Sequence, residues 1–307
     1  MGPTSMTMNV FATTNTANQG IGQSQSALQL GVCVSGNGTL FACDNVNTQN
    51  QTNTGNNAAA QSGGNGNGGN SATQGIGQSQ TSNQNAGVVS GGSTTGSGNN
   101  QNTQNQTNTG SNAVGQQGGN GNGGNSATQG IGQSQTSNQN AQCVAGGNTA
   151  NSCNNTSTQN QANSGNNAAA QSGGNGNGGN SATQGIGQSQ TSNQNAQCVS
   201  GKDAIVSCDN ASFQNQVNSG SNVLGQLGGN GNGNGNGGNS ATQGIGQSQT
   251  SNQNAQCASG GNVADSCNNV STQNQANSGN NAAAQQGGNG DNNDSGDNND
   301  SGDNNDE

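Results

Sequence analysis

The chain has very few of the residues that build an ordinary globular core or an active site. Its 307 residues include no His, Trp or Tyr, a single cation and a single proline. Leu, Ile, Val and Phe together number 28. That is about 9%, and chains below roughly 20% in these residues rarely fold around an apolar core. Without histidine there is no Ser-His-Asp or Cys-His nucleophile and no imidazole ligand for a metal. These absences indicate that the chain is not an enzyme.

Charge and hydropathy exclude two further classes of protein. The one cation, Lys202, cannot neutralise a phosphate backbone, so the sequence predicts no nucleic-acid partner. No apolar run approaches the ~20 residues of a transmembrane helix, so it also predicts no membrane span. Residues 1–19 lack the basic region and apolar core of a signal peptide. A secreted chain would therefore need a signal elsewhere or another export route.

What the chain has instead is one unit repeated five times. The string QGIGQSQ begins, at spacings of 55, 55, 55 and 59 residues, at Gln19, Gln74, Gln129, Gln184 and Gln243. A fixed period of this kind indicates stacked supersecondary units. The expected divisions are an N-terminal segment 1–16, the repeats 17–71, 72–126, 127–181, 182–240 and 241–290, and an acidic tail 291–307. Asn (64) and Gln (41) make up about a third of this low-complexity chain.

Two segments of every repeat alternate with a period of two, as extended strands do. In the fourth repeat the large residues of the first segment share one parity: Gln184, Ile186, Gln188 and Gln190. The apolar replacements in the second segment also share one parity, which we expect to be buried: Phe213, Val217 and Val223. Asn and Gly favour neither helix nor strand, so a β fold would depend on ladders of identical side chains. The alternative is a disordered polymer.

The eight cysteines form four pairs, each enclosing nine residues: Cys33/Cys43, Cys143/Cys153, Cys198/Cys208 and Cys257/Cys267. The second repeat has Val88 and Gly98 at the equivalent positions, so it lacks both members of the pair. This joint loss predicts a disulfide within each repeat, across the base of a hairpin-like loop, rather than between repeats. Disulfides would place the chain outside the reducing cytosol. Zinc binding is the alternative, although zinc sites usually space their ligands two to four residues apart.

The charged residues indicate where the chain meets water. The five that precede the tail lie in or beside the cysteine loops: Asp44, Lys202, Asp203, Asp209 and Asp265. Glycosylation sequons, which agree with an exposed edge on a secreted protein, begin at Asn37, Asn50, Asn105, Asn154, Asn155, Asn210 and Asn269. The tail is expected to be solvated and disordered. The alternative is that the tail binds calcium weakly, through Asp291, Asp294, Asp297, Asp300, Asp303 and Asp306. No other cofactor is expected.

The strand-like segments resemble the curlin repeat of bacterial curli fibres. In the third repeat the matching alternate residues are Gln161, Gly165, Asn167, Ala169 and Gln171. The chain departs from the curlin pattern in its Gly-to-Asn spacing, its longer repeat and its cysteine loop. It is also similar to the tandem Asn/Gln-rich surface proteins of ammonia-oxidising archaea. These resemblances imply a β-solenoid or amyloid-like subunit of an extracellular fibre or biofilm matrix.

The sequence thus predicts an all-β fold, a solenoid or cross-β rod of five repeats with disulfide-tied loops. The expected function is that of a secreted structural subunit that self-associates into filaments or a cell-surface layer. We expect the first repeat to supply the assembly surface through Leu28, Leu30 and Val32, where the fourth repeat has polar residues. The alternative function is a flat surface that binds ice or glycans, although the outward threonines look irregularly placed in the sequence.

Overall fold

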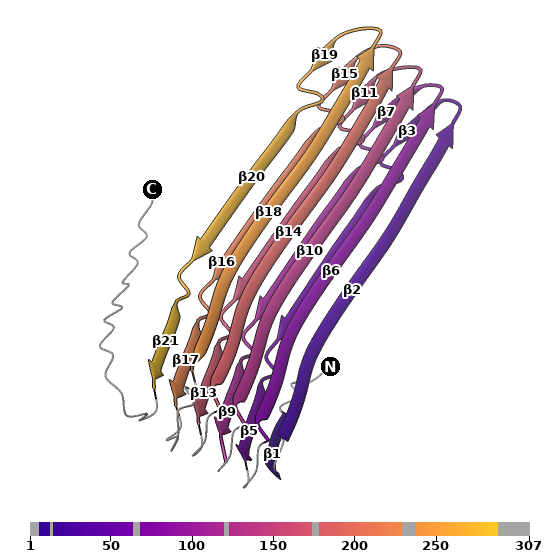
Figure 1. Cartoon of the computed structure of the whole chain (residues 1–307). Helices are drawn as coiled ribbons and strands as arrows, with labels where there is room; N and C mark the ends of the chain where they lie inside the picture. Colours follow the sequence, from indigo (N-terminus) through magenta and orange to yellow (C-terminus); the bar gives the residue numbers. More distant parts are fainter. Residues whose placement is uncertain are drawn as a thin grey trace, which may run out of the picture.

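The computed structural model describes residues 6–12, 15–63, 68–119, 123–173, 178–228 and 238–287. These residues form parallel β-sheets wound into five rungs, with no helix among them (Figure 1). The prediction of an all-β, repetitive solenoid is confirmed, and disorder does not describe this part of the chain. The acidic tail, with its calcium candidates, lies outside the described residues.

Each rung begins with a long strand, and these five strands form the long sheet. They are β2 (Asn15–Ser35), β6 (Asn70–Ser90), β10 (Asn125–Ala145), β14 (Asn180–Ser200) and β18 (Ser240–Ser259). Short strands at the turn form the tip sheet: β3 (Gly38–Leu40), β7 (Ser93–Thr95), β11 (Thr149–Ala150), β15 (Ala204–Ile205) and β19 (Val263–Ala264).

The chain then runs back along two return sheets that face the long sheet (Figure 1). The upper return sheet contains β4 (Asn45–Asn53), β8 (Asn100–Asn108), β12 (Asn155–Asn163), β16 (Asn210–Asn218) and β20 (Asn269–Asn277). The lower return sheet contains β5 (Asn57–Gly63), β9 (Asn112–Gln117), β13 (Asn167–Ser172), β17 (Asn222–Leu227) and β21 (Asn281–Gln286). A sixth strand, β1 (Met6–Ala12), extends the lower return sheet beyond β5.

Every rung pairs with the next in perfect register. Equivalent residues of neighbouring repeats lie opposite each other, for example Gln129 opposite Gln184 and Cys143 opposite Cys198. The fifth rung keeps this register although its repeat is offset by 59 residues instead of 55. The four additional residues lie in the connector between β17 and β18. Register therefore depends on the strands and is independent of connector length.

The interior between the sheets is polar. Alternate residues of the long strands point inward, and they include the large residues predicted for the fourth repeat, all buried. Small apolar clusters interrupt the amides, including an isoleucine column whose fully buried members are Ile76, Ile131 and Ile186. The expected burial of the apolar parity in the second segment is wrong. Phe213, Val217 and Val223 point outward and are 44%, 39% and 50% exposed.

The solenoid is wider than it is tall. Strands lie about 4.8 Å apart in a sheet, so five rungs extend about 24 Å along the stacking axis. A strand of 21 residues, such as β10, extends about 70 Å at ~3.3 Å per residue. The folded chain is thus a short, broad slab of solenoid, and its two stacking surfaces are large relative to its height. We call the surface at β2, β3 and β4 the head end and the surface at β18, β19, β20 and β21 the tail end.

Candidate functional site

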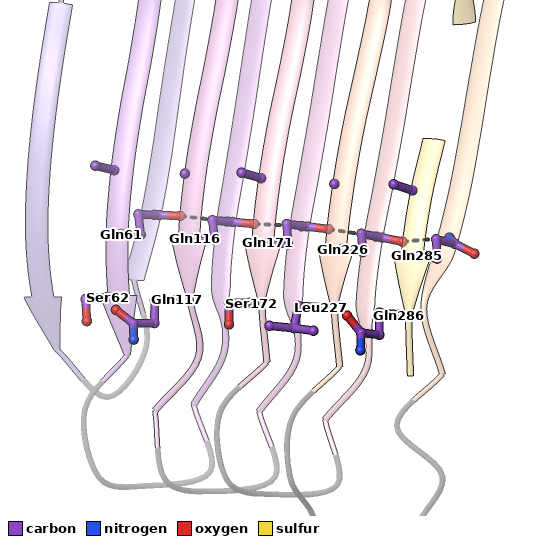
Figure 2. A pocket seen from close by; sticks show the side chains of 15 residues that line it. Gln61, Ser62, Gln116, Gln117, Gln171, Ser172, Gln226, Leu227, Gln285 and Gln286 are labelled. Carbon is purple, nitrogen blue, oxygen red and sulfur yellow. Dashed lines mark hydrogen bonds between the residues drawn. The ribbon is translucent and has the colours of Figure 1, made fainter. Parts of the chain in front are cut away.

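Inward glutamines form columns, and the inner rungs of these columns use every amide group. Gln129 Nε2 donates to Gln74 Oε1 at 3.0 Å and to the backbone oxygen of Ala168, across the interior, at 3.0 Å. Its Oε1 accepts from Gln184 Nε2 at 2.7 Å. Both N–H groups and the carbonyl are therefore satisfied, which removes the penalty for burying an amide. Seven such columns link the rungs. Figure 2 shows the column of the lower return sheet: Gln61, Gln116, Gln171, Gln226 and Gln285.

Inward asparagines form columns that run in the opposite direction. Asn112 Nδ2 donates to Asn167 Oδ1 at 2.9 Å and to the backbone oxygen of Gly130 at 3.1 Å. Its Oδ1 accepts from Asn57 Nδ2 of the preceding rung at 2.9 Å. Inward glutamine columns thus donate toward the head end and inward asparagine columns toward the tail end. Each column has a direction, and the two ends of the slab are chemically different.

At the head end the columns stop with unused groups. Gln23 Nε2 donates only to the backbone oxygen of Thr52 at 3.2 Å, so one of its N–H groups has no partner among the described residues. Gln25, at 3.1 Å from the backbone oxygen of Asn50, is in the same state. Asn45 uses both N–H groups, on Asn85 and Asn100, but its Oδ1 accepts nothing in the described chain. The head end therefore presents open glutamine donors and open asparagine acceptors.

The tail end presents the complementary groups. Gln247 Nε2 donates to Gln188 Oε1 at 2.8 Å and to the backbone oxygen of Ala276, while its own Oε1 has no partner among the described residues. Asn269 Oδ1 accepts from Asn210 at 2.8 Å, and its Nδ2 likewise donates to no described residue. Open glutamine acceptors and open asparagine donors therefore face away from the fifth rung.

The upper return strand of the tail end has a second set of open donors. In inner rungs its glutamines also reach the long strand of the following rung, as Gln161 does with the backbone oxygen of Ser189 at 3.0 Å. The fifth rung has no following long strand, and Gln275 donates only to Gln216, at 3.1 Å, within the described residues. This open donor lies where a further long strand would supply a carbonyl.

The predicted assembly residues lie on the terminal strand β2, but they do not face along the stacking axis. Leu28, Leu30 and Val32 point out from the broad face of the long sheet and are 75%, 72% and 65% exposed. Their register partners on β6 are polar or glycine: Asn83, Asn85 and Gly87. Together with Val34 they form an apolar stripe at the side of the head end. The end surface itself consists of the amides described above, which the sequence analysis did not single out.

The four predicted disulfides are present, each within one repeat and with 6.0 Å between its Cα atoms. They join Cys33 to Cys43, Cys143 to Cys153, Cys198 to Cys208 and Cys257 to Cys267. The bonds stack in a column below the tip sheet, and in the second rung Val88 occupies the column instead. All eight cysteines are paired in this way, and none is free.

Each disulfide joins the two sides of the loop in which the chain reverses, but this loop is not a paired β-hairpin. The tip strand inside each loop pairs with the tip strands of neighbouring rungs and does not pair back on its own long strand. The first cysteine of each pair lies on a long strand, whereas the second lies in a bend outside the strands. These second cysteines have a left-handed backbone that the sequence analysis did not predict, with φ 61° at Cys43, 56° at Cys153, 58° at Cys208 and 60° at Cys267.

The second rung shows the same bend without a disulfide. Gly98, the counterpart of the second cysteine, has φ 71°. Glycine adopts a left-handed conformation without strain, whereas a residue with a Cβ does so at a cost. In the other rungs the disulfide holds the cysteine in this conformation. The bend is therefore a fixed feature of every rung, and glycine is used where no disulfide holds the loop.

Aspartates in the loops link neighbouring rungs. Asp44 accepts the backbone N–H of Asn99, and Asp209 accepts that of Asn268, each at 2.8 Å. Burial raises the pKa of the Asp209 carboxyl, the hydrogen bonds from Asn268 act against this, and nearby Asp265 adds to the increase. Within the described residues no group of three or more His, Cys, Asp or Glu residues could hold a metal ion.

The sequons fall into two classes in the structure. Asn155 and Asn210 are buried, and their amides belong to an inward column. Asn269 continues that column at the tail end. Glycosylation at these three sites is incompatible with the ladder, so the expectation that they mark an exposed loop edge is wrong. Asn37 lies exposed at the tip, and Asn50 and Asn105 point outward on the upper return sheet.

The broad outer faces carry small residues in regular columns. A shallow groove of about 970 Å³ follows the outside of the lower return sheet, over Ala60, Gly115, Ala170, Gly225 and Ala284 (Figure 2). Another groove, of about 720 Å³, follows the outside of the long sheet along its glycine columns. Threonines flank those glycines in the columns Thr73, Thr128, Thr183, Thr242 and Thr81, Thr136, Thr191, Thr250. On this face the outward threonines are regular, contrary to the expectation from the sequence.

The described residues include no helix that is long and apolar enough to cross a membrane. Two features of the described residues can therefore support a function. They are the open amide columns at the two complementary ends and the small residues on the broad outer faces. In comparisons with known proteins, no protein-family model, no curated protein and no solved structure matches this chain.

Proposed function

We propose that this chain is a secreted structural subunit of an extracellular fibre, biofilm matrix or cell-surface layer, built by self-association of solenoid slabs. The observation that carries the proposal is the pair of open ends, where amide columns that are satisfied inside the slab stop with unused donors and acceptors. Strand edges with unpaired backbone groups bind further strands unless they are covered. Additional rungs are the natural partners of such edges.

The shape of the slab and its covalent bonds support the same function. A stack of five rungs is about 24 Å tall, and only addition of further copies would make it longer than its ~70 Å strands. The four disulfides suit an oxidising compartment, as expected for a secreted protein. The resemblance to curlin repeats supports an amyloid-like fibre in particular. The exposed stripe of Leu28, Leu30 and Val32 would add lateral contacts between stacked slabs.

The test is to purify the oxidised full chain and raise its concentration under quiescent conditions. Electron microscopy should show filaments, and their diffraction should give a spacing near 4.8 Å along the filament axis, to within about 0.1 Å. Light scattering should rise with the filaments. A chain that stays strictly monomeric at high concentration, with its β circular dichroism intact, would contradict the proposal.

A second candidate function is binding of ice or of an ordered glycan to the outer face of the long sheet. The observation in its favour is the pair of threonine columns, repeated about every 4.8 Å beside flat glycine columns. Substituting T128K and T183K should abolish inhibition of ice recrystallisation, or binding to insoluble polysaccharide, without affecting filaments. If the unchanged chain shows neither activity, this second function is excluded.

A further inference from the structure

We infer that the head end binds the tail end of a second copy in a single polar orientation, and that this requires β1 to leave the edge of β5. The inference rests on the proposed function, because it concerns how slabs join. The partner is a second copy of this chain, and β1 controls access to it.

The strand count shows why β1 must move. The long, tip and upper return sheets have five strands each, whereas the lower return sheet has six because β1 pairs with β5. If β2 and β4 of one copy continue the sheets of β18 and β20 of another, β5 must pair with β21. The edge of β5 that would receive β21 is the edge that β1 occupies. The joined state and the bound state of β1 exclude each other.

The sequence of β1 differs from that of the inner rungs at the register positions of the amide columns. Met6 lies opposite Asn57, and Val10 lies opposite Gln61. Methionine and valine contain no side-chain amide, whereas the inner rungs have asparagine and glutamine at these register positions. The strand therefore covers one edge without creating an equivalent new one, which is how terminal units of solenoids block addition.

The column directions leave one orientation for the join. Head-to-tail stacking places the open N–H of Gln23 next to the open Oε1 of Gln247, and the open Oδ1 of Asn45 next to the open Nδ2 of Asn269. Head-to-head stacking would not continue the columns, because identical residues would no longer lie opposite each other across the joint. It would also make the strands antiparallel across the joint, whereas all strand pairs within the described slab are parallel.

Replacement of β1 by the tail end of a second copy is favourable because β1 is short. It pairs over seven residues, whereas the joint would pair the 21 residues of β2 as well as β4 and β5. An incoming tail end therefore gains far more strand pairing than β1 gives up. The β1 strand acts as a removable cover that slows the first contact between copies.

The first experiment holds β1 in place in the full chain. Asn9 and Ala60 are register partners, so the oxidised N9C/A60C variant would tie β1 to β5. The matched control is N9S/A60S, which changes the same positions without a bond. We expect the locked variant to elongate filaments at least tenfold more slowly than the control. Equal elongation rates in a variant whose added disulfide is confirmed by mass spectrometry would overturn the inference.

The second experiment weakens β1 without a cysteine. M8D/V10D places charges at the register positions of Ala59 and Gln61, whose side chains are buried, and T7D/N9D places the same charges at the alternate positions. We expect a severalfold shorter lag for M8D/V10D than for T7D/N9D, with unchanged β circular dichroism in both. Equal lags, or a longer lag for M8D/V10D, would contradict the role of β1.

The orientation is tested by cross-linking across the joint. Ser26 and Thr250 belong to one outward column of the long sheet, in the first and fifth rungs. In a head-to-tail stack the two are neighbours, so S26C/T250C should form covalent ladders of chains on oxidation. The control S26C/T242C displaces one thiol by eight residues, about 27 Å, and should give none. Ladders of equal yield in both variants, or none in filaments of S26C/T250C, would overturn the orientation.

The outcomes separate this inference from the proposed function. Filaments that grow equally well with β1 locked would reject the role of β1 and leave the fibre function standing. Absence of filaments from the unchanged chain and from M8D/V10D alike, under all conditions in which the β signal is intact, would reject both.

Discussion

The inward and outward faces of this solenoid reverse the distribution of polar and apolar residues that most proteins have. Inward positions hold large polar amides, and Gln80, Gln135 and Gln190 are 0% exposed. Outward positions hold glycine, alanine, serine and many of the large apolar residues, including Phe213 at 44% exposure. The two faces differ in whether equivalent residues of neighbouring rungs must be identical. An inward amide needs the same amide above and below it, whereas an outward side chain needs no particular neighbour.

This contrast explains how so few apolar residues accompany an ordered fold. A buried amide is destabilising only when its hydrogen bonds are unmade. In the inner rungs of the glutamine columns, every donor and acceptor is satisfied by an identical residue one rung away or by a backbone carbonyl across the interior. Substitutions that break identity inside the slab should therefore be far more damaging than changes outside it, and the following variants measure that difference.

The largest effect is expected from Q135L in the third rung. Leucine removes the bonds to Gln80, Asn160 and Gln190, and leaves the buried side-chain oxygen of Gln80 and one amide N–H of Gln190 unsatisfied. At about 1–3 kcal/mol for each of these two unmet groups, the free energy of unfolding should fall by roughly 2–6 kcal/mol. The control T136V changes the next, outward residue and should shift it by less than about 0.5 kcal/mol. Denaturant midpoints compare the two. Similar losses of stability in Q135L and T136V would contradict the view that the inward glutamine columns stabilise the fold.

The next largest effect concerns the tip loops. C143S/C153S should reduce the free energy of unfolding by about 2.5–3 kcal/mol, the loop-closure value for a bond between residues ten apart.

The converse variant V88C/G98C should add a fifth disulfide to the second rung and stabilise it by only about 1 kcal/mol, because a cysteine at position 98 has a strained left-handed backbone. Thermal melts of oxidised proteins test both, with V88S/G98S as the control for the second. A destabilised V88C/G98C with its bond formed would show that strain dominates.

A smaller gain in stability is expected where one inward column changes from asparagine to serine within the slab. Asn47 donates to Asn102 at 2.9 Å, but the third rung has Ser157, and Asn102 Nδ2 is buried without a partner in the described chain. S157N would restore the acceptor and should stabilise the fold by about 1 kcal/mol. The control S157A restores nothing and should not stabilise to that extent. A loss of stability in S157N would indicate that the interior lacks space there.

The smallest effect is a pH dependence at Asp209. Its raised pKa means that the folded state holds the proton more tightly than the unfolded state. The contribution is therefore complete below the ordinary aspartate pKa of about 3.9 and is lost as the pH rises through the raised value. D209N, which matches the asparagine of neighbouring rungs, should remove this slope and equal or exceed the unchanged chain in stability at pH 7. Melting temperatures from about pH 3 to 7 test this, and parallel curves would contradict it.

Much of the fold could be predicted because repetition and alternation are both visible in the sequence. The five QGIGQSQ strings mark the rungs, and the joint absence of cysteines at Val88 and Gly98 indicates bonds within repeats. The parity of the second segment was predicted wrongly because burial of apolar residues was assumed. Phe213 has Thr158 and Thr272 as register partners. The informative signal was constancy across repeats, which marks the inward positions.

The candidate site was less accessible to sequence reasoning. Its chemistry is the set of groups left over where columns stop, and an identical glutamine is satisfied in one rung and open in another. Leu28 and Leu30 stand out by composition, yet they point sideways from the end. The role of β1 depends on which edge it covers, and its sequence, MTMNVFA, shows only a weak alternation. Only the topology shows that it competes with a second copy.

The opposed directions of the inward amide columns have an electrical consequence. An amide in a column is a dipole aligned with its neighbours, and aligned peptide dipoles add up along a helix. Here seven inward glutamine columns are set against four complete inward asparagine columns, so much of their axial dipole cancels within each rung. A filament could therefore grow long while accumulating smaller opposing partial charges at its two ends than columns of one direction would place there.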